Sequence, residues 1–255
     1  MSKNKNYNYN YNVAVICDSI DYTLGGSSIS AKRFTNFLIS ANFSVFLYTN
    51  NVRNKESKFF NKVVLRELHN FPLFKTPNFI FGFACKNYFV KEFSRNKIDL
   101  LYCIYPSTFI SFFAIQAAIN KRIPIIGHFH VQAENINKWL KYKPLKYLFY
   151  KFSLYFYNKC TLVICPSEFA KNLLKSYGIK SNLVVISNGV NTAKYRPINK
   201  YKKRTRRFNF LYFGRLEPEK DLDTLLRAAN IFLKKYKEVN FNIAGNGVLK
   251  EHLIN

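Results

Sequence analysis

Residues 162–177 read LVICPSEFAKNLLKSY and combine a strand signal with a helix signal. Four consecutive apolar residues, followed by a Pro-Ser turn, are typical of a strand that is buried on both faces. The turn leads into a pattern in which apolar residues recur every three or four positions, which predicts a helix over 167–177. Strands that alternate with helices in this way are typical of a parallel sheet covered by helices on both faces.

The same alternation extends on both sides of this stretch. Further strand-like runs lie at 13–17, 44–48, 100–104, 123–127 and 183–186, and further helical patterns at 28–41, 78–95, 107–120 and 144–159. We therefore predict an α/β fold with an N-terminal Rossmann-like domain over residues 13–190. Residues 1–12 form a low-complexity sequence rich in Asn and Tyr, which predicts a disordered tail.

A basic segment at 191–207, which ends in KYKKRTRR, predicts a linker. After it, a strand is expected at 208–213, a helix at 221–236, a strand at 239–244 and a helix from about 248. We therefore expect a second Rossmann-like domain over 208–255. Because a doubly wound domain usually has five or six strands, we expect this second domain to be incomplete, as in a truncated or split protein.

The chain carries a large excess of positive charge. Its 255 residues include 40 Lys and Arg against 14 Asp and Glu, for a formal net charge of +26 at pH 7. Hydrophobic residues make up 48% of the chain, which excludes a disordered or collagen-like protein. The charge is compatible with an anionic partner and equally with compositional drift in an AT-rich genome.

The cysteines and the chain start bear on cellular location. Five scattered cysteines, with no CxxC pair, argue against a disulfide scaffold or a zinc ribbon. The polar N-terminus lacks the apolar segment of a signal peptide, and the aromatic-apolar stretch at 145–157 is too short to span a bilayer. We expect a cytoplasmic protein, or a peripheral one on the cytoplasmic face of a membrane.

The turn after the first predicted strand contains Gly25 and Gly26. Paired glycines let the backbone approach a ligand closely, and the amides of a following helix favour a phosphate. The pattern is not the GxGxxG of nicotinamide-binding proteins, so it is equally compatible with a flexible loop before a helix.

Two histidines follow the strand predicted at 123–127. His128 and His130 are two positions apart, so their side chains point to one face of an extended segment, and Glu134 lies nearby. Three interpretations are open: a substrate-binding site at the carboxyl end of the strand, a structural cap, or a metal site that uses both histidines and Glu134.

The second half begins with a phosphate-like turn. Gly214 ends a strand, Arg215 follows it, and Lys220 precedes a helix, so a guanidinium, an ammonium and a helix N-terminus face the same way. Such groups bind a diphosphate, although they also fit solvated charges. A second glycine turn, with Gly245 and Gly247, follows the next strand.

Several segments together are similar to one family. They are Gly25-Gly26, IPIIGHFHVQAEN at 123–135, VICPSE at 163–168, VISNGVN at 185–191, FGRLEPEKDLDTLLRAA at 213–229 and IAGNG at 243–247. In order and spacing they resemble the retaining glycosyltransferases of family 4, which have the GT-B architecture of two Rossmann-like domains.

The resemblance implies transfer of a sugar from a UDP- or GDP-linked donor, with retained anomeric configuration and without a metal or another cofactor. His130 matches the catalytic-site histidine that contacts the transferred sugar. The resemblance also assigns a set of donor-binding residues: Arg215, Lys220, Gly25 and Gly26 to the diphosphate, and Gly214, Gly245 and Gly247 to the nucleotide. The family's pair of glutamates beyond this region is absent, so we expect a second chain to supply the rest of the donor site.

The acceptor expected from the resemblance is a glycan or a lipid-linked molecule. Between 135 and 167 no acidic residue occurs, and lysines alternate with aromatic residues, which fits either an anionic membrane surface or a helix with solvated lysines. Two alternatives stay open: a non-catalytic remnant or subunit of a split transferase, and a basic nucleic-acid-binding protein. The second is disfavoured because the charge is spread along the chain.

Overall fold

The computed structural model describes residues 11–19, 26–51, 63–68, 85–104, 109–130, 143–197 and 207–254. The chain divides into two compact units, Met1–Gly189 and Val190–Asn255. The division falls one residue before the end of the predicted N-terminal domain. No helix in the described part of the chain is long and apolar enough to cross a membrane.

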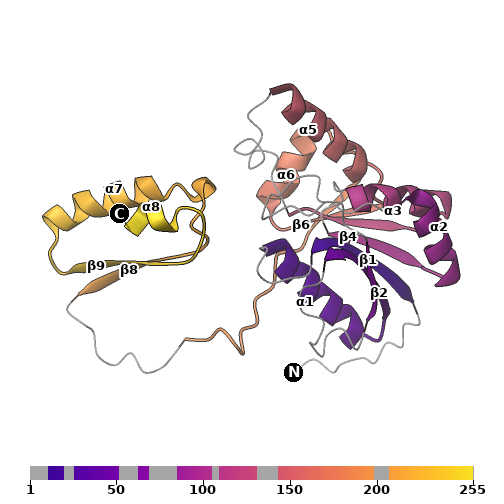
Figure 1. Ribbon diagram of the computed structural model, residues 1–255, viewed down its shortest axis with the longest axis horizontal. Coiled ribbons are helices and arrows are strands. Elements are labelled where there is room, and N and C mark those ends of the chain that lie inside the picture. The colour runs from indigo at the N-terminus through magenta and orange to yellow at the C-terminus, as the bar shows by residue number, and fades with distance from the viewer. Residues whose placement is uncertain are drawn as a thin grey trace. The chain divides into compact units, whose positions relative to one another are not determined.

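The first unit is built on a parallel sheet of seven strands in the order β3-β2-β1-β4-β5-β6-β7 (Figure 1). The strands are β1 Asn12–Ser19, β2 Ser44–Asn51, β3 Val64–Glu67, β4 Leu100–Ile104, β5 Ile125–His128, β6 Leu162–Cys165 and β7 Asn182–Val185. The order of the strands reverses between β1 and β4. In an open α/β sheet, ligands bind outside the carboxyl ends of the strands at such a point.

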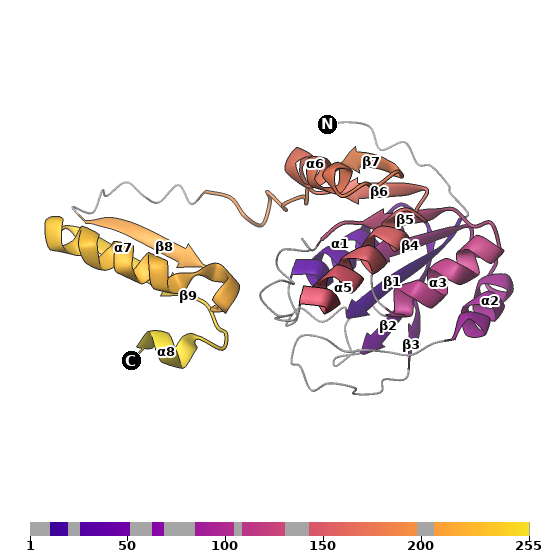
Figure 2. The same cartoon turned by 90° about the horizontal axis from the view of Figure 1, so that it is seen from above.

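Helices cover both faces of this sheet (Figure 2). They are α1 Gly26–Ser40, α2 Lys86–Arg95, α3 Phe109–Asn120, α5 Lys143–Tyr157 and α6 Glu168–Ser176. Side chains alternate between the faces along a strand, so Val15 of β1 packs in one cluster with Ala31 of α1, and Ile16 in the other with Phe89 of α2. The result is a three-layer unit.

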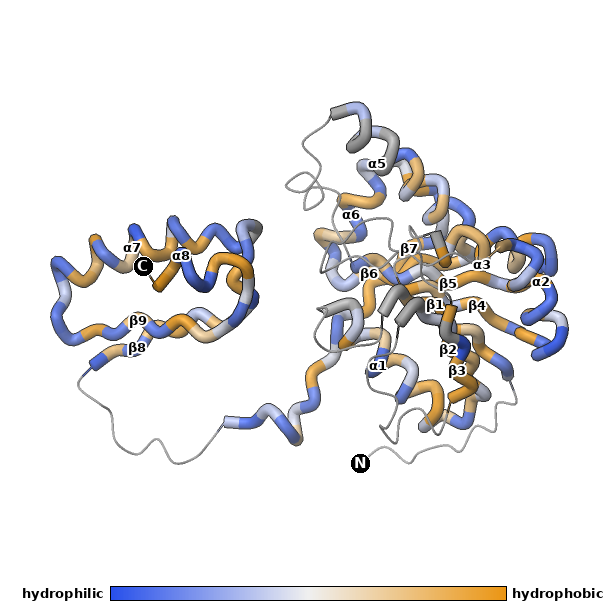
Figure 3. The backbone as a smooth tube through the Cα atoms, viewed as in Figure 1, coloured by the Kyte–Doolittle hydropathy of each residue, from blue (hydrophilic) through white to orange (hydrophobic). Residues whose placement is uncertain are grey.

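This double cover explains the continuous apolar runs in the sequence. The strands of the seven-stranded sheet carry much of the apolar colour in Figure 3, whereas α2 shows both polar and apolar residues. Val13, Ile16 and Leu101 are completely buried. Each such side chain contributes about 1.5–3 kcal/mol relative to an exposed position. Hydrophobic burial is therefore the main stabilising term of this unit.

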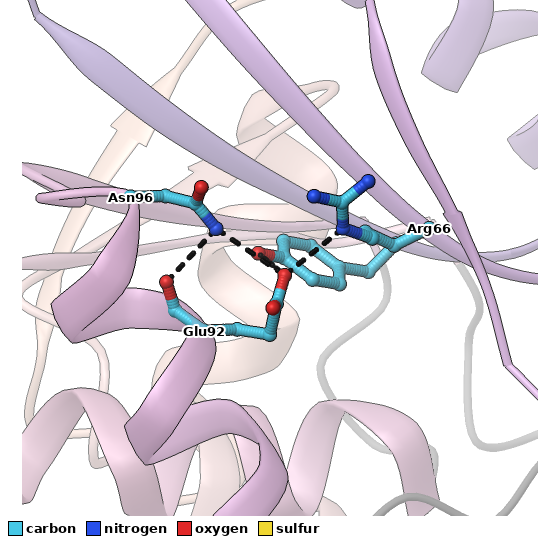
Figure 4. A network of polar contacts seen from close by, with 4 residues as sticks. Arg66, Glu92 and Asn96 are labelled. Carbon is cyan, nitrogen blue, oxygen red and sulfur yellow. Dashed lines mark hydrogen bonds and ion pairs between the residues drawn. The ribbon is translucent and has the colours of Figure 1, made fainter.

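The edge strand β3 is held by a polar network that the sequence did not predict (Figure 4). Arg66 Nε lies 3.0 Å from Oε2 of Glu92 on α2, and Asn96 Nδ2 donates to the same oxygen at 3.2 Å. The hydroxyl of Tyr48 on β2 donates to it at 3.4 Å. Burial raises the pKa of this phenol, with the Glu92 charge adding to the effect, so the tyrosine donates as a neutral group. The network ties β2 and β3 to α2.

Two predicted boundaries are corrected by the structure. β1 begins at Asn12, where the tail was expected, because the Asn12 amide donates to Asp99 Oδ2 at 2.8 Å and its side chain to the Asn96 carbonyl oxygen at 3.0 Å. β5 runs over Ile125–His128 rather than 123–127, because His128 still pairs with Ile104 of β4. His128 is thus part of the strand.

The second unit contains, in its described part, two parallel strands and the helices beside them. The elements are β8 Phe208–Phe213, the short 3-10 helix η3 Pro218–Lys220, α7 Leu222–Lys235, β9 Val239–Ala244 and α8 Lys250–Ile254. α7 covers one face of the pair: the rings of Phe210 and Phe232 are 5.6 Å apart, and Phe210 stacks on Phe241 at 4.7 Å. On the opposite face, Leu211 and Phe213 are 67% and 84% exposed.

Candidate functional site

In the first unit, the histidine segment lies at the carboxyl end of β5. His128 is the last residue of the strand and His130 follows two positions later. Gly26 is the first residue of α1, which follows β1. Gly25 and Glu134 lie outside the described residues, so their predicted roles stay predictions.

His128 is held by a tyrosine from the neighbouring strand. Its Nδ1 lies 2.7 Å from the hydroxyl of Tyr102 on β4, and both side chains are buried. The ring of Phe34 on α1 stacks on Tyr102, with centroids 3.7 Å apart and planes 16° from parallel. α1, β4 and β5 therefore converge on this histidine.

The two imidazoles lie against each other. Their centroids are 4.0 Å apart and their planes differ by 37°. Burial lowers the pKa of His128 to about 3, with His130 adding to the effect, and burial lowers the pKa of His130 to about 4. Both rings are therefore neutral at cytoplasmic pH. Within the described part of the chain, the Nε2 atoms of both are buried without a hydrogen-bond partner.

A metal site at these histidines gains no support from the geometry. Among the described residues, no group of three His, Cys, Asp or Glu side chains is placed to hold a metal ion. Rings that stack at 4.0 Å are also poorly arranged to direct two nitrogens at one ion. Neutral histidines at a strand end fit better as hydrogen-bonding groups for a polar ligand.

In the second unit, the turns after β8 and β9 pack directly on each other. The Gly214 amide donates to the Ala244 carbonyl oxygen at 3.1 Å, and the Leu216 amide to the Asn246 carbonyl oxygen at 2.9 Å. Leu249 returns a bond from its amide to the Leu216 carbonyl oxygen at 3.0 Å. These bonds extend the pairing of the strands into the turns.

The glycines make this packing possible. A Cβ atom on Gly245 would collide with the Gly214 carbonyl oxygen, and one on Gly247 with the backbone of Leu216. A Cβ on Gly214 would lie 2.9 Å from the hydroxyl of Tyr212. The sequence predicted these three glycines as nucleotide-binding residues, and the structure adds a packing reason for each.

The cationic side chains lie at the same turn. Arg215 and Lys220 are both exposed, and the Tyr212 hydroxyl donates to the Arg215 carbonyl oxygen at 2.7 Å. Lys220 ends η3, and Asp221, with a φ of +51°, makes the left-handed turn into α7. The turn thus brings Arg215, Lys220 and the N-terminus of a fourteen-residue helix to the carboxyl end of β8.

Two residues near these sites were not predicted from the sequence. Tyr102 lies in the apolar run of β4, and a hydroxyl in a buried strand is itself a signal, because such a group needs a partner. Glu217 is buried in the second unit, and its Oε2 has no hydrogen-bond partner in the described part of the chain. Nothing in the local sequence distinguishes it from the exposed Glu residues.

The structure groups the predicted residues by unit. Gly26 and His130 belong to the first unit, and Arg215, Lys220 and the three glycines gather at one edge of the second. The shared edge in the second unit is carried by backbone bonds, and the histidine site in the first by side chains.

Comparison with known proteins assigns the family. The sequence model of Glycosyltransferase Family 4 matches residues 24–194. A curated relative, the alpha-monoglucosyldiacylglycerol synthase of Streptococcus pneumoniae, is 32% identical over 143 residues; the match covers 49% of this chain and 32% of that protein. The chain therefore matches about a third of the length of this relative.

Solved structures share the fold at low sequence identity. HepE of Anabaena, in complex with UDP and glucose, superposes over 94% of this chain and 62% of its own, with a TM-score of 0.61 and 15% identity. TarM of S. aureus covers 96% of this chain and 74% of its own, with a TM-score of 0.65 and 14% identity. The sucrose-phosphate synthase of Thermosynechococcus elongatus covers 92% and 70%, with a TM-score of 0.63 and 14% identity.

These likenesses confirm the predicted α/β fold of GT-B type. The family model alone spans more than half of the chain, including α1, the histidine segment and β7. The chain belongs to glycosyltransferase family 4.

Proposed function

We propose that the chain takes part in retaining transfer of a sugar from a nucleotide-diphosphate sugar to a glycan or lipid-linked acceptor. The observation that carries the proposal is the double turn of the second unit, where the glycine turns of β8 and β9 pack together beside Arg215 and Lys220. Family membership supports the same reaction.

The chemistry of that turn fits a diphosphate. A guanidinium offers a planar fork of donors to phosphate oxygens, and a lysine adds a mobile charge. The N-terminus of α7, directly after Lys220, adds the positive end of a helix dipole. As the bond to the sugar breaks, negative charge develops on the diphosphate, and these groups stabilise it without a metal.

The first unit would supply the acceptor side and the sugar contact. In this proposal His130, neutral at pH 7 with Nε2 buried and unpartnered among the described residues, hydrogen-bonds the transferred sugar. Gly25 and Gly26 before α1 would approach the donor phosphates. UDP is favoured as the nucleotide over GDP because solved structures with this fold, HepE and a TarM variant, were obtained with UDP.

A lipid acceptor at a membrane surface is supported by the exposed face of α5. Tyr147, Lys151, Tyr155 and Lys159 recur every four residues, and each lysine lies 5.3 Å from the ring of the tyrosine before it. The opposite face is buried, with Phe156 packed against Phe112. Alternating tyrosines and lysines suit an anionic headgroup layer, and the S. pneumoniae relative is named for a glycolipid product.

The nucleotide proposal is tested by the thermal stability of the full chain with UDP, GDP and their sugars, and with single-stranded DNA as a control. A ligand that binds only the folded state raises the unfolding midpoint. We expect UDP or a UDP-sugar to raise it, and Arg215→Ala and Lys220→Ala each to reduce the shift. Lys234→Ala, at the other end of α7, is the matched control.

A nucleotide shift that survives both substitutions would contradict the assignment of Arg215 and Lys220. A shift with DNA alone would favour the nucleic-acid-binding alternative. For the membrane proposal, flotation with anionic vesicles is expected to carry the chain, and Lys151→Ala with Lys159→Ala to weaken it; equal flotation with neutral vesicles would contradict the proposal.

The second candidate function is that of a non-catalytic subunit of a split transferase. The exposed Leu211 and Phe213 on the open face of β8 favour it, because such a face in a doubly wound domain is normally covered. In that case a second chain would supply the rest of the donor domain. A cooperative unfolding transition that no nucleotide shifts would support this candidate over the first.

A further inference from the structure

The group beneath His130 is built more completely than a structural cap requires. Tyr102 is fully buried between Phe34 of α1 and His128 of β5. Its hydroxyl has one printed partner, Nδ1 of His128 at 2.7 Å. A bond this short between two buried neutral groups fixes the position of both rings.

The direction of this bond follows from the inventory of protons. Burial raises the pKa of Tyr102, so its hydroxyl keeps its proton, and that proton needs an acceptor in a buried site. Nδ1 of His128 is the acceptor within reach. If Tyr102 donates, Nδ1 carries no proton and the single proton of the neutral imidazole lies on Nε2.

The second imidazole lies on the first. With centroids 4.0 Å apart, the His130 ring loses a packing surface if His128 moves. Phe129, between them in the chain, is buried on the other side of the strand, and its amide donates to the Ile164 carbonyl oxygen of β6 at 2.9 Å. The backbone that carries His130 is therefore fixed as well.

We infer that Tyr102 and His128 are positioning residues for His130. The Tyr102 hydroxyl donates to Nδ1 of His128 and sets its tautomer, and the fixed His128 ring supports the imidazole of His130 from one side. The role assigned to His130 rests on the proposed function, whereas the arrangement of the three side chains does not depend on it.

The charged surroundings leave this arrangement undisturbed over a wide pH range. Among the described residues, the titratable groups that act on the pair are His130, beside His128, and Cys103, next to Tyr102 on β4. Burial also raises the pKa of the Cys103 thiol, so it is neutral. No carboxylate of the described residues competes with His128 for the Tyr102 proton.

The test is nitrogen-15 NMR of the full chain with labelled histidine, because the tautomer of each ring is read directly from its two nitrogens. The chain has four histidines, so the signals are assignable by single substitutions. We expect His128 of the unmodified chain to be a single tautomer with the proton on Nε2. In Tyr102→Phe we expect a mixture of tautomers at His128 and shifted ring signals at His130.

Tyr48→Phe is the matched control. Tyr48 is equally buried in the same sheet, and its hydroxyl contacts Glu92 instead of a histidine. We expect it to leave the signals of His128 and His130 unchanged. His252 of the second unit is an internal reference that stays constant in both variants.

A second pair of variants separates the hydrogen bond from the ring contact. His128→Asn keeps an acceptor for Tyr102 but removes the ring, and His128→Phe keeps a ring but removes the acceptor. We expect both to shift the His130 signals, with the larger change for the asparagine. These variants and the unmodified chain decide the matter even where Tyr102→Phe fails to fold.

The inference is overturned if His128 carries its proton on Nδ1, or if His130 is indifferent to Tyr102→Phe and to both His128 variants. Absence of nucleotide binding with the expected tautomer intact would contradict the proposed function alone. Intact nucleotide binding with a different tautomer would contradict this inference alone.

Discussion

The two units use the same strand–turn–helix sequence but are stabilised differently. In the first, helices cover both faces of the sheet, and Ile16 of β1 is fully buried. In the second, α7 covers one face, and Phe213 at the end of β8 is 84% exposed. The first unit therefore depends on hydrophobic burial, whereas the second depends more on backbone contacts between its two glycine turns. Similar local patterns thus acquire different energetics from what lies beside them.

The largest expected effect contrasts a core phenylalanine with an exposed one. Phe89 of α2 is fully buried against Tyr48 and Phe93, so Phe89→Ala is expected to lower the free energy of unfolding by about 3–5 kcal/mol. Phe213→Ala is expected to change it by less than about 0.5 kcal/mol. Urea unfolding followed by circular dichroism measures both. Equal losses would mean that the face of β8 is covered in solution.

Acid is expected to destabilise the first unit through its buried histidines. The folded-state pKa values of about 3 for His128 and about 4 for His130 lie below the ordinary value near 6.5, so the unfolded state binds protons first. Stability is fully present above pH 6.5 and falls as the pH drops toward 4. Each ring contributes a slope of at most about 1.4 kcal/mol per pH unit.

The pH series is measured by urea unfolding between pH 7.5 and pH 5. His128→Phe is expected to flatten the curve, because one of the two rings no longer takes up a proton on unfolding. His252→Gln is the control, since His252 is exposed beside Asp223 in the second unit. An unchanged slope in His128→Phe would show that this ring is already protonated, or solvated, in the folded state.

The strands show where prediction from sequence succeeds. The bounds of β4, β6, β8 and β9 match the expected ranges, because each is an apolar run that ends at a polar residue or a glycine. β3 was missed: its four residues VLRE alternate weakly, and the strand is held by the contact of Arg66 with Glu92 on α2. That contact joins residues far apart in the sequence, so no local pattern reports it.

The candidate sites divide in the same way. The glycine turns and His130 were found because their spacing is local. The partner of His128, in contrast, is Tyr102 on an adjacent strand, 26 positions away. Sequence reasoning places both at the sheet, but only the order β4-β5 and the register of the strands bring hydroxyl and imidazole into contact.

A smaller effect is expected from the close packing of the glycine turns. Gly247→Ala places a Cβ against the backbone of Leu216, which cannot move as a flexible side chain would. We expect a loss of about 1–3 kcal/mol in the second unit and a weaker nucleotide shift. Gly189→Ala, where nothing lies within 4 Å of the added Cβ, is the matched control. Full stability of Gly247→Ala would show that the two turns are not in contact.

The smallest effect is expected at Asp221, which precedes α7 with a φ of +51° and no side-chain capping bond. Asp221→Gly relieves the left-handed backbone but makes the unfolded chain more flexible and removes a carboxylate from the positive end of α7. Because these terms oppose one another, each at about 0.5–1 kcal/mol, the net change is expected to be below about 0.5 kcal/mol. Asp221→Val keeps the strain, adds a β-branched side chain and loses the charge, so it is expected to cost about 1–2 kcal/mol. Thermal unfolding of the two variants measures the difference, and equal stability would mean that residue 221 does not adopt a left-handed conformation. A stronger UDP shift in Asp221→Gly would further indicate that its carboxylate opposes the anion expected beside Lys220.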